Sequence, residues 1–362
     1  MAGVTPAPTA GLPHNGTGYC RSVPTAPSPP SRGQESDWEG VRLHVVTGKG
    51  GTGKSTVAAS LALALAARGG TVLLCEVEGR QGIAQLFDVP PLPYEERRIV
   101  AGPHGRGEVY ALAIDTEAAL LEYLAMYYRL GRAGKALDRF GIIDFATTIA
   151  PGVRDVLLTG KVYEAVHRNR RTKHARQYDA VVLDAPPTGR IAQFLNVNGE
   201  LAGLAKVGPI RTQADNVMSL LHSPLTRVHL VTVLEDMPVQ ETADGIEELR
   251  GHRLPVGGVV VNLARPAELD AHERDQATSG RLDADALRAD LERVGVRTTK
   301  PLLEGLLYEA REHAERRDLE DEQRKRIREL DVPTYELPRL ADGIDIGALY
   351  ELAGELCEQG MA

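Results

Sequence analysis

The residues with the clearest chemical potential form a glycine-rich run with two lysines, GKGGTGKST at positions 48–56. It fits the pattern G-x-x-x-x-G-K-[ST], in which glycines let backbone N–H groups close around a phosphate. Lys54 is then placed to reach the β- and γ-phosphates, and the Ser55 hydroxyl to bind Mg²⁺. The run predicts a nucleoside triphosphate site with magnesium. Its expected ligands are Gly48, Gly50, Gly51, Thr52, Gly53, Lys54, Ser55 and Thr56.

The residues on either side supply the elements that such a loop requires. Val41–Thr47 is a short β-branched stretch, and Ser55–Ala67 is rich in alanine and leucine. Strand, glycine loop and helix in that order are the setting in which this pattern binds phosphate. The N-terminus of the helix adds partial positive charge. The flanking residues therefore favour a nucleotide site over a chance match.

A further lysine, Lys49, follows the first glycine of the run. It is not needed to hold the phosphates, because Lys54 already does so. One interpretation is a solvated loop lysine. The other is a cation supplied across a dimer interface to the phosphates of a partner, as an arginine finger is. Such a finger accelerates phosphoryl transfer by about 10³- to 10⁵-fold. Lys49 alone does not decide between the two.

Three apolar runs end in polar side chains that suit nucleotide hydrolysis. The second expected strand leads to Glu78, which is either a base that orients the attacking water or a solvated acid. The segment YDAVVLDAPPTG at 178–189 ends a strand in Asp184, a standard source of a carboxylate near Mg²⁺. Its Pro-Pro-Thr-Gly turn is placed to sense the γ-phosphate. VVVN ends in Asn262, whose amide suits an adenine edge or the start of a turn.

From residue 41 onward, short apolar runs alternate with helical stretches, which is typical of a parallel sheet covered on both faces. Residues 116–175 and 190–225 are too long for simple crossovers and are expected to form a helical subdomain that caps one edge of the sheet. The fold predicted is an α/β P-loop NTPase with an inserted helical subdomain. Strands are expected at Leu43–Thr47, Val72–Val77, Val109–Ile114, Ala180–Asp184, Val228–Leu234 and Gly258–Asn262, and helices at Pro238–Gly251 and Ile346–Gln359.

Composition narrows the class of protein. The chain has 362 residues, 43% of them hydrophobic and 25% charged, with a net charge of −8. The acidic balance argues against nucleic acid as the main partner. Cys20, Cys75 and Cys357 are far apart and form no C-x-x-C pair, so neither a disulfide scaffold nor a zinc clamp is expected. That usage suits a reducing cytoplasm.

The most polar and the most apolar stretches of the chain indicate where the folded domain begins and whether a membrane span is present. Residues 1–38 are rich in Pro, Gly, Ser, Thr and Ala, which predicts a disordered tail ahead of one folded domain at 39–362. The longest apolar stretch, around Ser60–Ala67, is far shorter than the roughly 18 residues of a membrane span. No basic-then-apolar signal sequence is visible. The sequence therefore predicts a cytoplasmic protein without an integral membrane segment.

Four segments together resemble the ArsA-type ATPases, which include arsenical-pump ATPases and those that target tail-anchored membrane proteins. They are KGGTGKST, DAPPTGRIAQFL, VVVN and YELPRLADGIDIGALYEL. The resemblance implies ATP and Mg²⁺ bound in a dimer, with Lys49 acting across the interface. It implies that Glu78 stands where the family keeps a water-positioning aspartate, and that Asp184 is the second magnesium-site carboxylate. It also implies that Asn262, Leu337 and Pro338 hold adenine.

Departures from the family pattern limit what it implies. The segment that usually reads D-P-A-H-N is here Glu78-Gly79-Arg80-Gln81-Gly82, and Arg190 replaces the usual histidine of the family's second switch segment, here DAPPTGRIAQFL. The arsenite-binding cysteine triad and the zinc C-x-x-C of the targeting branch have no counterpart. Neither cargo is therefore expected to carry over directly.

The leading hypothesis is a Mg²⁺-dependent ATPase that cycles between ATP and ADP. Its dimer, with a copy or a paralogue, would open and close with the nucleotide and engage a membrane-protein or transporter client. A second hypothesis is a nucleotide-dependent switch that hydrolyses slowly or not at all, which the longer acid Glu78 favours. A third is a positioning ATPase like MinD or ParA. Its membrane or DNA surface is disfavoured by the acidic balance.

Overall fold

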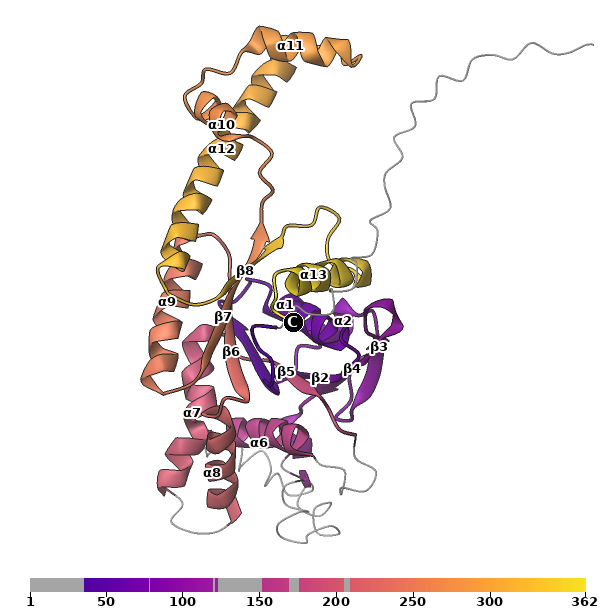
Figure 1. Cartoon of the computed structure of the whole chain (residues 1–362), viewed down its shortest axis with the longest axis vertical. Coiled ribbons are helices and arrows are strands. Elements are labelled where there is room, and N and C mark those ends of the chain that lie inside the picture. Colours follow the sequence, from indigo (N-terminus) through magenta and orange to yellow (C-terminus); the bar gives the residue numbers. More distant parts are fainter. Residues whose placement is uncertain (1–35, 78, 120, 123–151, 169–175, 205–208) are drawn as a thin grey trace, which may run out of the picture.

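The computed structural model describes residues 36–77, 79–119, 121–122, 152–168, 176–204 and 209–362 (Figure 1). This part of the chain contains one sheet of eight strands in the order β3-β4-β2-β5-β1-β6-β7-β8. β3 runs antiparallel to β4, and the other neighbouring pairs are parallel. The strands are β1 Leu43–Gly48, β2 Thr71–Glu76, β3 Arg97–Ala101, β4 Glu108–Ala113, β5 Ala180–Asp184, β6 Thr226–Thr232, β7 Val256–Ala264 and β8 Thr334–Pro338.

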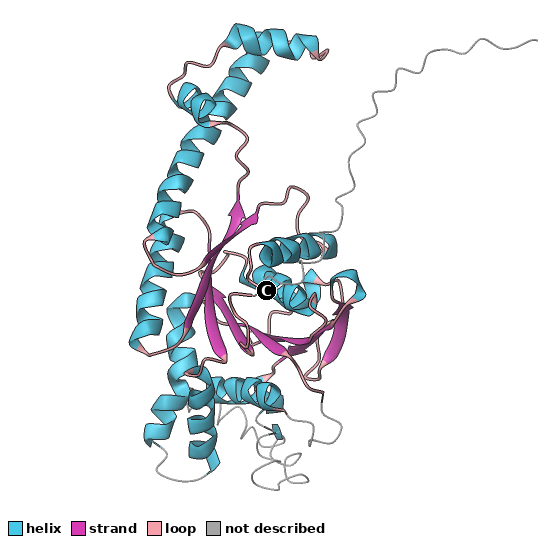
Figure 2. Ribbon diagram, viewed as in Figure 1, coloured by secondary structure: helices cyan, strands magenta, loops and turns pink. Residues whose placement is uncertain are grey.

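Helices cover both faces of the sheet (Figures 1 and 2). α1 and α13 pack together on one face, and α6 to α9 lie on the other. The helices are α1 Lys54–Ala66, α2 Gly82–Leu86, α6 Val153–His167, α7 Thr188–Leu204, α8 Pro209–Leu221, α9 Asp236–Gly251, α10 Ala271–Thr278, α11 Ala284–Arg293, α12 Lys300–Arg328 and α13 Ile346–Glu358, with a 3₁₀ turn, η1, at Pro103–Gly105. The fold is the expected α/β P-loop NTPase arrangement.

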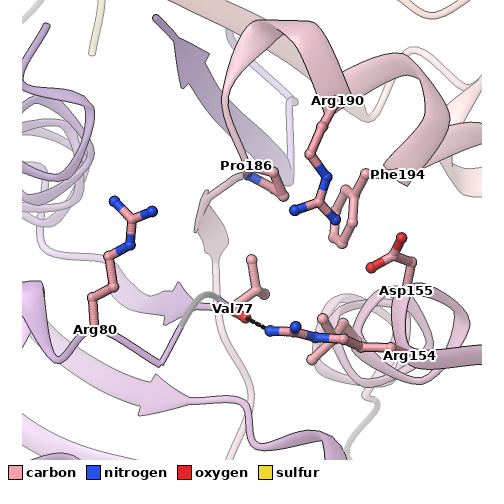
Figure 3. Close-up of a pocket in the computed structure, with 8 residues that line it drawn as sticks. Val77, Arg80, Arg154, Asp155, Pro186, Arg190 and Phe194 are labelled. Carbon is pink, nitrogen blue, oxygen red and sulfur yellow. Dashed lines mark hydrogen bonds between the residues drawn. The ribbon is translucent and has the colours of Figure 1, made fainter. Parts of the chain in front are cut away.

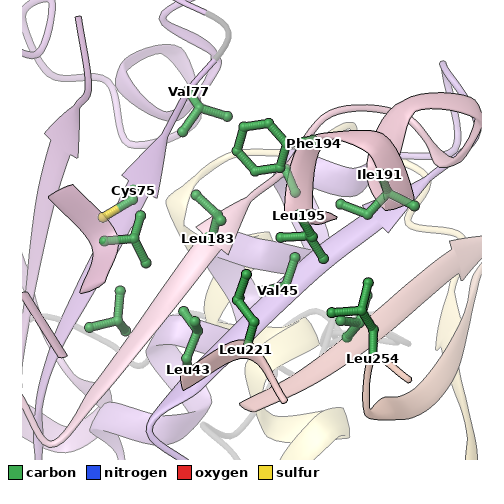
Figure 4. Packing of buried hydrophobic residues seen from close by; sticks show 14 of the residues in the cluster. Leu43, Val45, Cys75, Val77, Leu183, Ile191, Phe194, Leu195, Leu221 and Leu254 are labelled. Carbon is green, nitrogen blue, oxygen red and sulfur yellow. The ribbon is translucent and has the colours of Figure 1, made fainter. Parts of the chain in front are cut away.

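The sheet separates two hydrophobic cores, because successive side chains of a strand point to opposite faces. Val45 belongs to the core beneath α6–α9, whereas its neighbour Val46 belongs to the core beneath α1 and α13. Figure 4 shows the first core, where Phe194 and Leu195 of α7 approach Leu183 of β5. Full burial of each such side chain contributes roughly 1.5–3 kcal/mol. The central strands are apolar on both faces for this reason.

The expected central strands are confirmed, with shifts of up to two residues at their ends. Two strands were not predicted. β3 is an edge strand that begins with two exposed arginines, Arg97 and Arg98, so it lacks the apolar run of a central strand. β8 contains Leu337 and Pro338, where no strand was expected. It is short and ends in a proline, which is tolerated there because β8 is the other edge of the sheet.

The helical segments expected at 116–175 and 190–225 include α6, α7 and α8, while residues 123–151 lie outside the described residues. The expected position at a sheet edge is wrong for α6 and α7. α6 packs on β5 and α7 packs on β1, in the middle of the sheet. Their apolar residues join the core of the sheet, so these helices form one of its covering layers.

The folded part extends further towards the N-terminus than the expected boundary at residue 39. Residues 1–35 lie outside the described residues, but 36–38 pack against the domain. The Asp37 backbone N–H donates to the Gly360 carbonyl oxygen at 2.9 Å, and the Tyr335 hydroxyl donates to the Asp37 carboxylate at 2.6 Å. The Trp38 ring meets the His229 ring edge to face, with centroids 5.4 Å apart. The last residues assigned to the tail therefore belong to the fold.

The charged region after β7 extends away from the sheet (Figure 1). Its main element is the 29-residue helix α12, which packs against α9 and carries α10 and α11. Most of α12 is exposed, as expected for a charged helix. Where it returns to the domain, Glu320 is buried and accepts from Arg265 at 2.6 Å and Arg317 at 3.0 Å. These ion pairs fix the base of the arm.

A buried histidine pair makes the stability of the sheet depend on pH. The Gly258 backbone N–H donates to His229 Nδ1 at 3.1 Å, so His229 Nε2 carries the hydrogen and donates to His44 Nδ1 at 3.1 Å. Burial, reinforced by the Arg227 charge, lowers the pKa of His44 to about 3. Burial, followed by His44 and Arg227, also lowers the pKa of His229 well below its usual value. Both rings are neutral in the folded protein.

We expect the free energy of unfolding to decrease as pH falls below about 6.5, because the unfolded histidines bind protons there and the buried ones do not. Each histidine with a lowered pKa should reduce the free energy of unfolding by about 2 kcal/mol between pH 6.5 and 5. Urea unfolding at a series of pH values measures this. The variant His44→Gln should show about half of the loss from the pair. The exposed control His252→Gln should behave as the wild type does. An equal decrease of the free energy of unfolding in His44→Gln and His252→Gln would contradict the assignment to the buried pair.

Candidate active site

The phosphate-binding run lies between β1 and α1, in the strand, loop and helix order expected from its sequence. Gly53 precedes α1 with φ 86°, a left-handed conformation that favours glycine. A Cβ atom on Gly53 would lie 2.3 Å from Asn262 Nδ2, and one on Gly48 would lie 2.2 Å from the Val231 carbonyl oxygen. These glycines let the loop approach β6 and β7 more closely than any side chain would allow.

The loop has the features of a phosphate cradle. The N-cap residue of α1 is Gly53, so this residue has no side-chain oxygen to cap the first N–H groups of the helix. A Cβ atom on Gly50 or Gly51 would meet nothing within 4 Å, so this stretch of backbone borders open space. Helix N-termini with accessible N–H groups attract phosphate. The geometry fits the triphosphate predicted from the sequence.

The hydroxyl and the carboxylate expected to bind Mg²⁺ lie together. Ser55 Oγ, in the first turn of α1, donates to Asp184 Oδ2 at 2.6 Å. β1 and β5 are parallel neighbours in a register that pairs Val46 with Asp184, which brings the end of β5 to the loop. Hydroxyl and carboxylate oxygens are the ligands that Mg²⁺ prefers. This donor set therefore fits the ion.

The turn after Asp184 is fastened to β1. The Thr47 hydroxyl donates to the Pro186 carbonyl oxygen at 2.7 Å, and the Ala185 N–H donates to the Val46 carbonyl oxygen at 2.9 Å. Thr188 then begins α7. Its hydroxyl is buried and has no hydrogen-bond partner among the described residues. The turn connects the phosphate loop with the first residues of α7.

The segment after β2 also reaches the site. Glu78, the expected water-orienting acid, lies outside the described residues. Its neighbour Glu76 is buried and accepts from the backbone N–H groups of Gly82, at 3.2 Å, and Ile83, at 3.3 Å. A Cβ atom on Gly82 would lie 3.7 Å from Ser55 Oγ. This structural role of Glu76 was not predicted, although an acid that ends an apolar run ahead of a glycine was a visible signal.

Asn262 lies at the loop rather than at a turn. Its side chain is buried, and Nδ2 donates to the Thr52 carbonyl oxygen at 2.9 Å. Leu337 is fully buried in the core beneath α1 and α13, and Pro338 is half-buried at the end of β8. The Leu337 side chain is therefore not accessible to a ligand, whereas Pro338 is partly exposed. The hydrogen bond from Asn262 to Thr52 supports the phosphate loop, and the sequence did not predict it.

Lys49 is held by its own chain. Its Nζ lies 2.6 Å from Glu241 Oε1 on α9, and its carbonyl oxygen accepts from the Thr52 hydroxyl at 2.9 Å. The side chains of Lys49 and Glu241 are 32% and 36% exposed, respectively. An ion pair at such an exposed position contributes at most about 1 kcal/mol. The pair orients Lys49 in the isolated chain but is weak enough to exchange for another anion.

The chain matches a family model and several known proteins. A family model described as anion-transporting ATPase matches residues 41–225, the part that carries the phosphate loop and Asp184. The chain belongs to the ArsA-type ATPase family. It is 55% identical over 331 residues to the ATPase BagA of Mycobacterium tuberculosis, covering 91% of this chain and 97% of that protein.

More distant members of the ArsA-type family also match. The chain is 25% identical over 276 residues to the ATPase GET3 of Rhodotorula glutinis, covering 67% of this chain and 76% of that one. It is 26% identical over 262 residues to the arsenical pump-driving ATPase of Acidiphilium multivorum, covering 67% and 42%, respectively. None of the described helices is long and apolar enough to cross a membrane. No group of three or more metal-ligating His, Cys, Asp or Glu side chains occurs among the described residues.

The close approach at Gly53 can be tested by adding a single methyl group. We expect Gly53→Ala to lower the free energy of unfolding by at least about 1–2 kcal/mol, because it forces a left-handed alanine against Asn262. Gly50→Ala is the matched control, since its Cβ atom would meet nothing. Urea unfolding without nucleotide measures both. Equal losses in the two variants would show that the loop does not depend on this contact.

Proposed function

We propose that this protein is a Mg²⁺-dependent ATPase whose dimer opens and closes with the nucleotide and thereby acts on a membrane-associated client or transport partner. The observation that carries the ATPase proposal is the 2.6 Å contact between Ser55 Oγ and Asp184 Oδ2 beside an open glycine loop. This contact joins a metal-binding hydroxyl and a carboxylate at the place where the β- and γ-phosphates meet the ion in P-loop enzymes.

Each residue of the site has a defined task in this proposal. The loop amides, Lys54 and the N-terminus of α1 hold the β- and γ-phosphates. Ser55 and Asp184 hold Mg²⁺, which when bound neutralises charge shared between those phosphates. Glu78 orients the attacking water, as its resemblance to the family's aspartate implies. The Pro186–Thr188 turn senses the γ-phosphate and passes its loss to α7.

Lys49 supplies the argument for a dimer. Lys54 already serves the phosphates of its own chain, and Lys49 occupies the position of the lysine that the family uses across the interface. Its ion pair with Glu241 is a resting arrangement that the partner's phosphates replace. More negative charge is gathered on a triphosphate than on one carboxylate, so the exchange is favourable when the subunits meet. The second subunit is a copy of this chain or a paralogue.

The client is proposed from the relatives and from the helices around the site. One relative is named as the ATPase that drives an arsenical pump, which is a transport partner. In the present chain α7 begins at the nucleotide-sensing turn and packs against α8 and α9. A change in the turn therefore reaches a helical layer large enough to alter a binding surface.

A second candidate function is a nucleotide-dependent switch with slow or no hydrolysis. Two observations favour it: the longer acid at Glu78 and the Lys49–Glu241 pair that keeps the spare cation in its own chain. Steady-state turnover that increases with a partner would exclude it. A positioning ATPase of the MinD or ParA kind is less favoured, because the net charge of −8 suits neither DNA nor an anionic membrane.

Single-turnover hydrolysis of radiolabelled ATP tests the catalytic assignments. We expect Lys54→Ala and Asp184→Asn to slow cleavage at least about 100-fold, because each removes charge stabilisation of the transition state. Lys49→Ala should cost about 10³-fold if it acts across the dimer. Glu78→Gln should lower the rate without weakening nucleotide binding. Lys300→Ala, at an exposed arm position, is the control. Rates like the wild type in all four site variants would remove the ATPase proposal.

The Lys49–Glu241 pair gives a separate prediction. Glu241→Gln removes the resting partner of Lys49 and should raise the hydrolysis rate by up to about fivefold, the factor that corresponds to 1 kcal/mol. The gain should shrink at high salt, because salt already screens the pair. Glu247→Gln, exposed on the same helix, should leave the rate unchanged. A lower rate in Glu241→Gln would mean that this carboxylate assists hydrolysis instead.

A further inference from the structure

A hollow of about 130 Å³ lies beside the nucleotide-sensing turn (Figure 3). Its walls come from the residues that follow β2, from the first turn of α6 and from the turn and first residues of α7. Its apolar part is lined by Val77, Leu158, Pro186 and Phe194. Its polar part is made by Arg80, Arg154, Asp155 and Arg190. None of these four has a role in the phosphate loop or in the magnesium site.

The charge of the hollow is unbalanced. Among the described residues that line it, three are arginines, whose guanidinium groups stay protonated, and one is an aspartate. Arg154 and Asp155 lie in the first turn of α6, and Arg190 lies in the first turn of α7, so the positive ends of two helices add to the arginines. Figure 3 shows Arg190 and Arg154 on one side and Arg80 across from them. Such an arrangement attracts an anion.

Asp155 offsets only one of the three positive charges. Burial raises its pKa, and the nearby Arg190 and Arg154 only partly counter that effect. Arg154 in addition donates to the Val77 carbonyl oxygen at 3.4 Å, which holds its guanidinium at the wall (Figure 3). The hollow thus keeps an excess of positive charge in a defined place.

The volume limits the size of the ligand. The space of about 130 Å³ is well below the roughly 300–1,000 Å³ of pockets that hold drug-sized ligands. A nucleotide needs several times more room. A phosphate or a small carboxylate fits, and arginine forks bind such oxygens in pairs.

We propose that this hollow binds a small oxyanion of phosphate or carboxylate size and thereby acts on the nucleotide-sensing turn. Two sources share this chemistry. One is the phosphate released by the protein's own ATP hydrolysis, which rests on the proposed function. The other is a small anion supplied from outside, which does not.

Contacts of the turn explain why an ion here affects the nucleotide. The Arg190 backbone N–H donates to the Pro187 carbonyl oxygen at 2.8 Å, and the Pro186 carbonyl oxygen accepts from Thr47 beside the phosphate loop. An ion held by the Arg190 side chain therefore favours one arrangement of this turn. By linkage, nucleotide and oxyanion then change each other's affinity by the same factor.

Calorimetric titration of the full chain with inorganic phosphate tests the site, with the phosphate loop filled by a non-hydrolysable ATP analogue and Mg²⁺. We expect one saturable site. Arg154→Gln and Arg190→Gln should each weaken phosphate at least tenfold. Asp155→Asn should tighten it severalfold, because it removes the opposing charge. Both arginines are exposed, so neither substitution should unfold the protein. Arg293→Gln on α11 is the control and should have no effect.

The outcomes separate the site from the ATPase proposal. No saturable phosphate binding, or equal binding by the wild type and all three hollow variants, would overturn the oxyanion site whatever the ATPase does. If the protein does not bind the analogue, the same variants are compared without it together with Lys54→Ala. In that case, weaker phosphate binding by the arginine variants supports the site in the hollow. Phosphate binding that is weakened only by Lys54→Ala overturns it.

A second measurement identifies the source of the ion. In a single turnover, cleavage is followed by acid quench and phosphate release by a phosphate-sensing fluorescent protein. If the hollow receives the product, Arg190→Gln changes the interval between cleavage and release. If it receives an external anion, that interval is unchanged, and added phosphate or acetate alters the cleavage rate of the wild type but not of Arg190→Gln. Either result supports the site; no effect of Arg190→Gln on any of these readouts overturns its coupling to the turn.

Discussion

The parallel pairing of β1 with β5 is the constraint on which the site depends. Because both strands run in the same direction and Val46 is paired with Asp184, the loop after β1 and the carboxylate that ends β5 meet at one edge. The Ser55–Asp184 hydrogen bond follows from that register. A shift of one residue would turn Asp184 to the opposite face and separate the two groups. The cores on both faces resist such a shift, since every buried strand residue would have to change sides.

The same register explains the second contact of the turn. β1 continues past Val46 to Thr47, and its hydroxyl reaches Pro186 because the chain after β5 lies directly beside it. β6 and β7 lie on the other side of β1, and they support the loop through Val231 and Asn262. The phosphate loop is therefore braced from both neighbours of β1. Glycine is required at Gly48 and Gly53, where Val231 and Asn262 approach the loop most closely, whereas the loop borders open space at Gly50 and Gly51.

How much the sequence predicts depends on whether a feature is local. The phosphate loop, its flanking elements and Asp184 were placed correctly, because a glycine pattern and an apolar strand with a terminal acid are each read from a dozen residues. The partners of these residues were not predictable in this way. Glu241 meets Lys49 from a helix 192 positions later, and Asn262 meets Thr52 from 210 positions away. Edge strands β3 and β8 were missed because they carry arginines and a proline instead of an apolar run.

The turn between β5 and α7 lies between two groups of charged side chains. On one side lie Ser55, Asp184 and the phosphate loop, and on the other lie the guanidinium groups of the hollow. Between them the backbone is fixed through Thr47, Pro186, Pro187 and Arg190 by consecutive hydrogen bonds. Energetic coupling travels through such contiguous contacts, and packed helices respond to it as units because close-packed interiors do not deform continuously. α7 packs against α8 and α9, and α9 carries Glu241, the resting partner of Lys49. The packed contacts from the turn thus continue through α7 and α9 to Glu241 and Lys49.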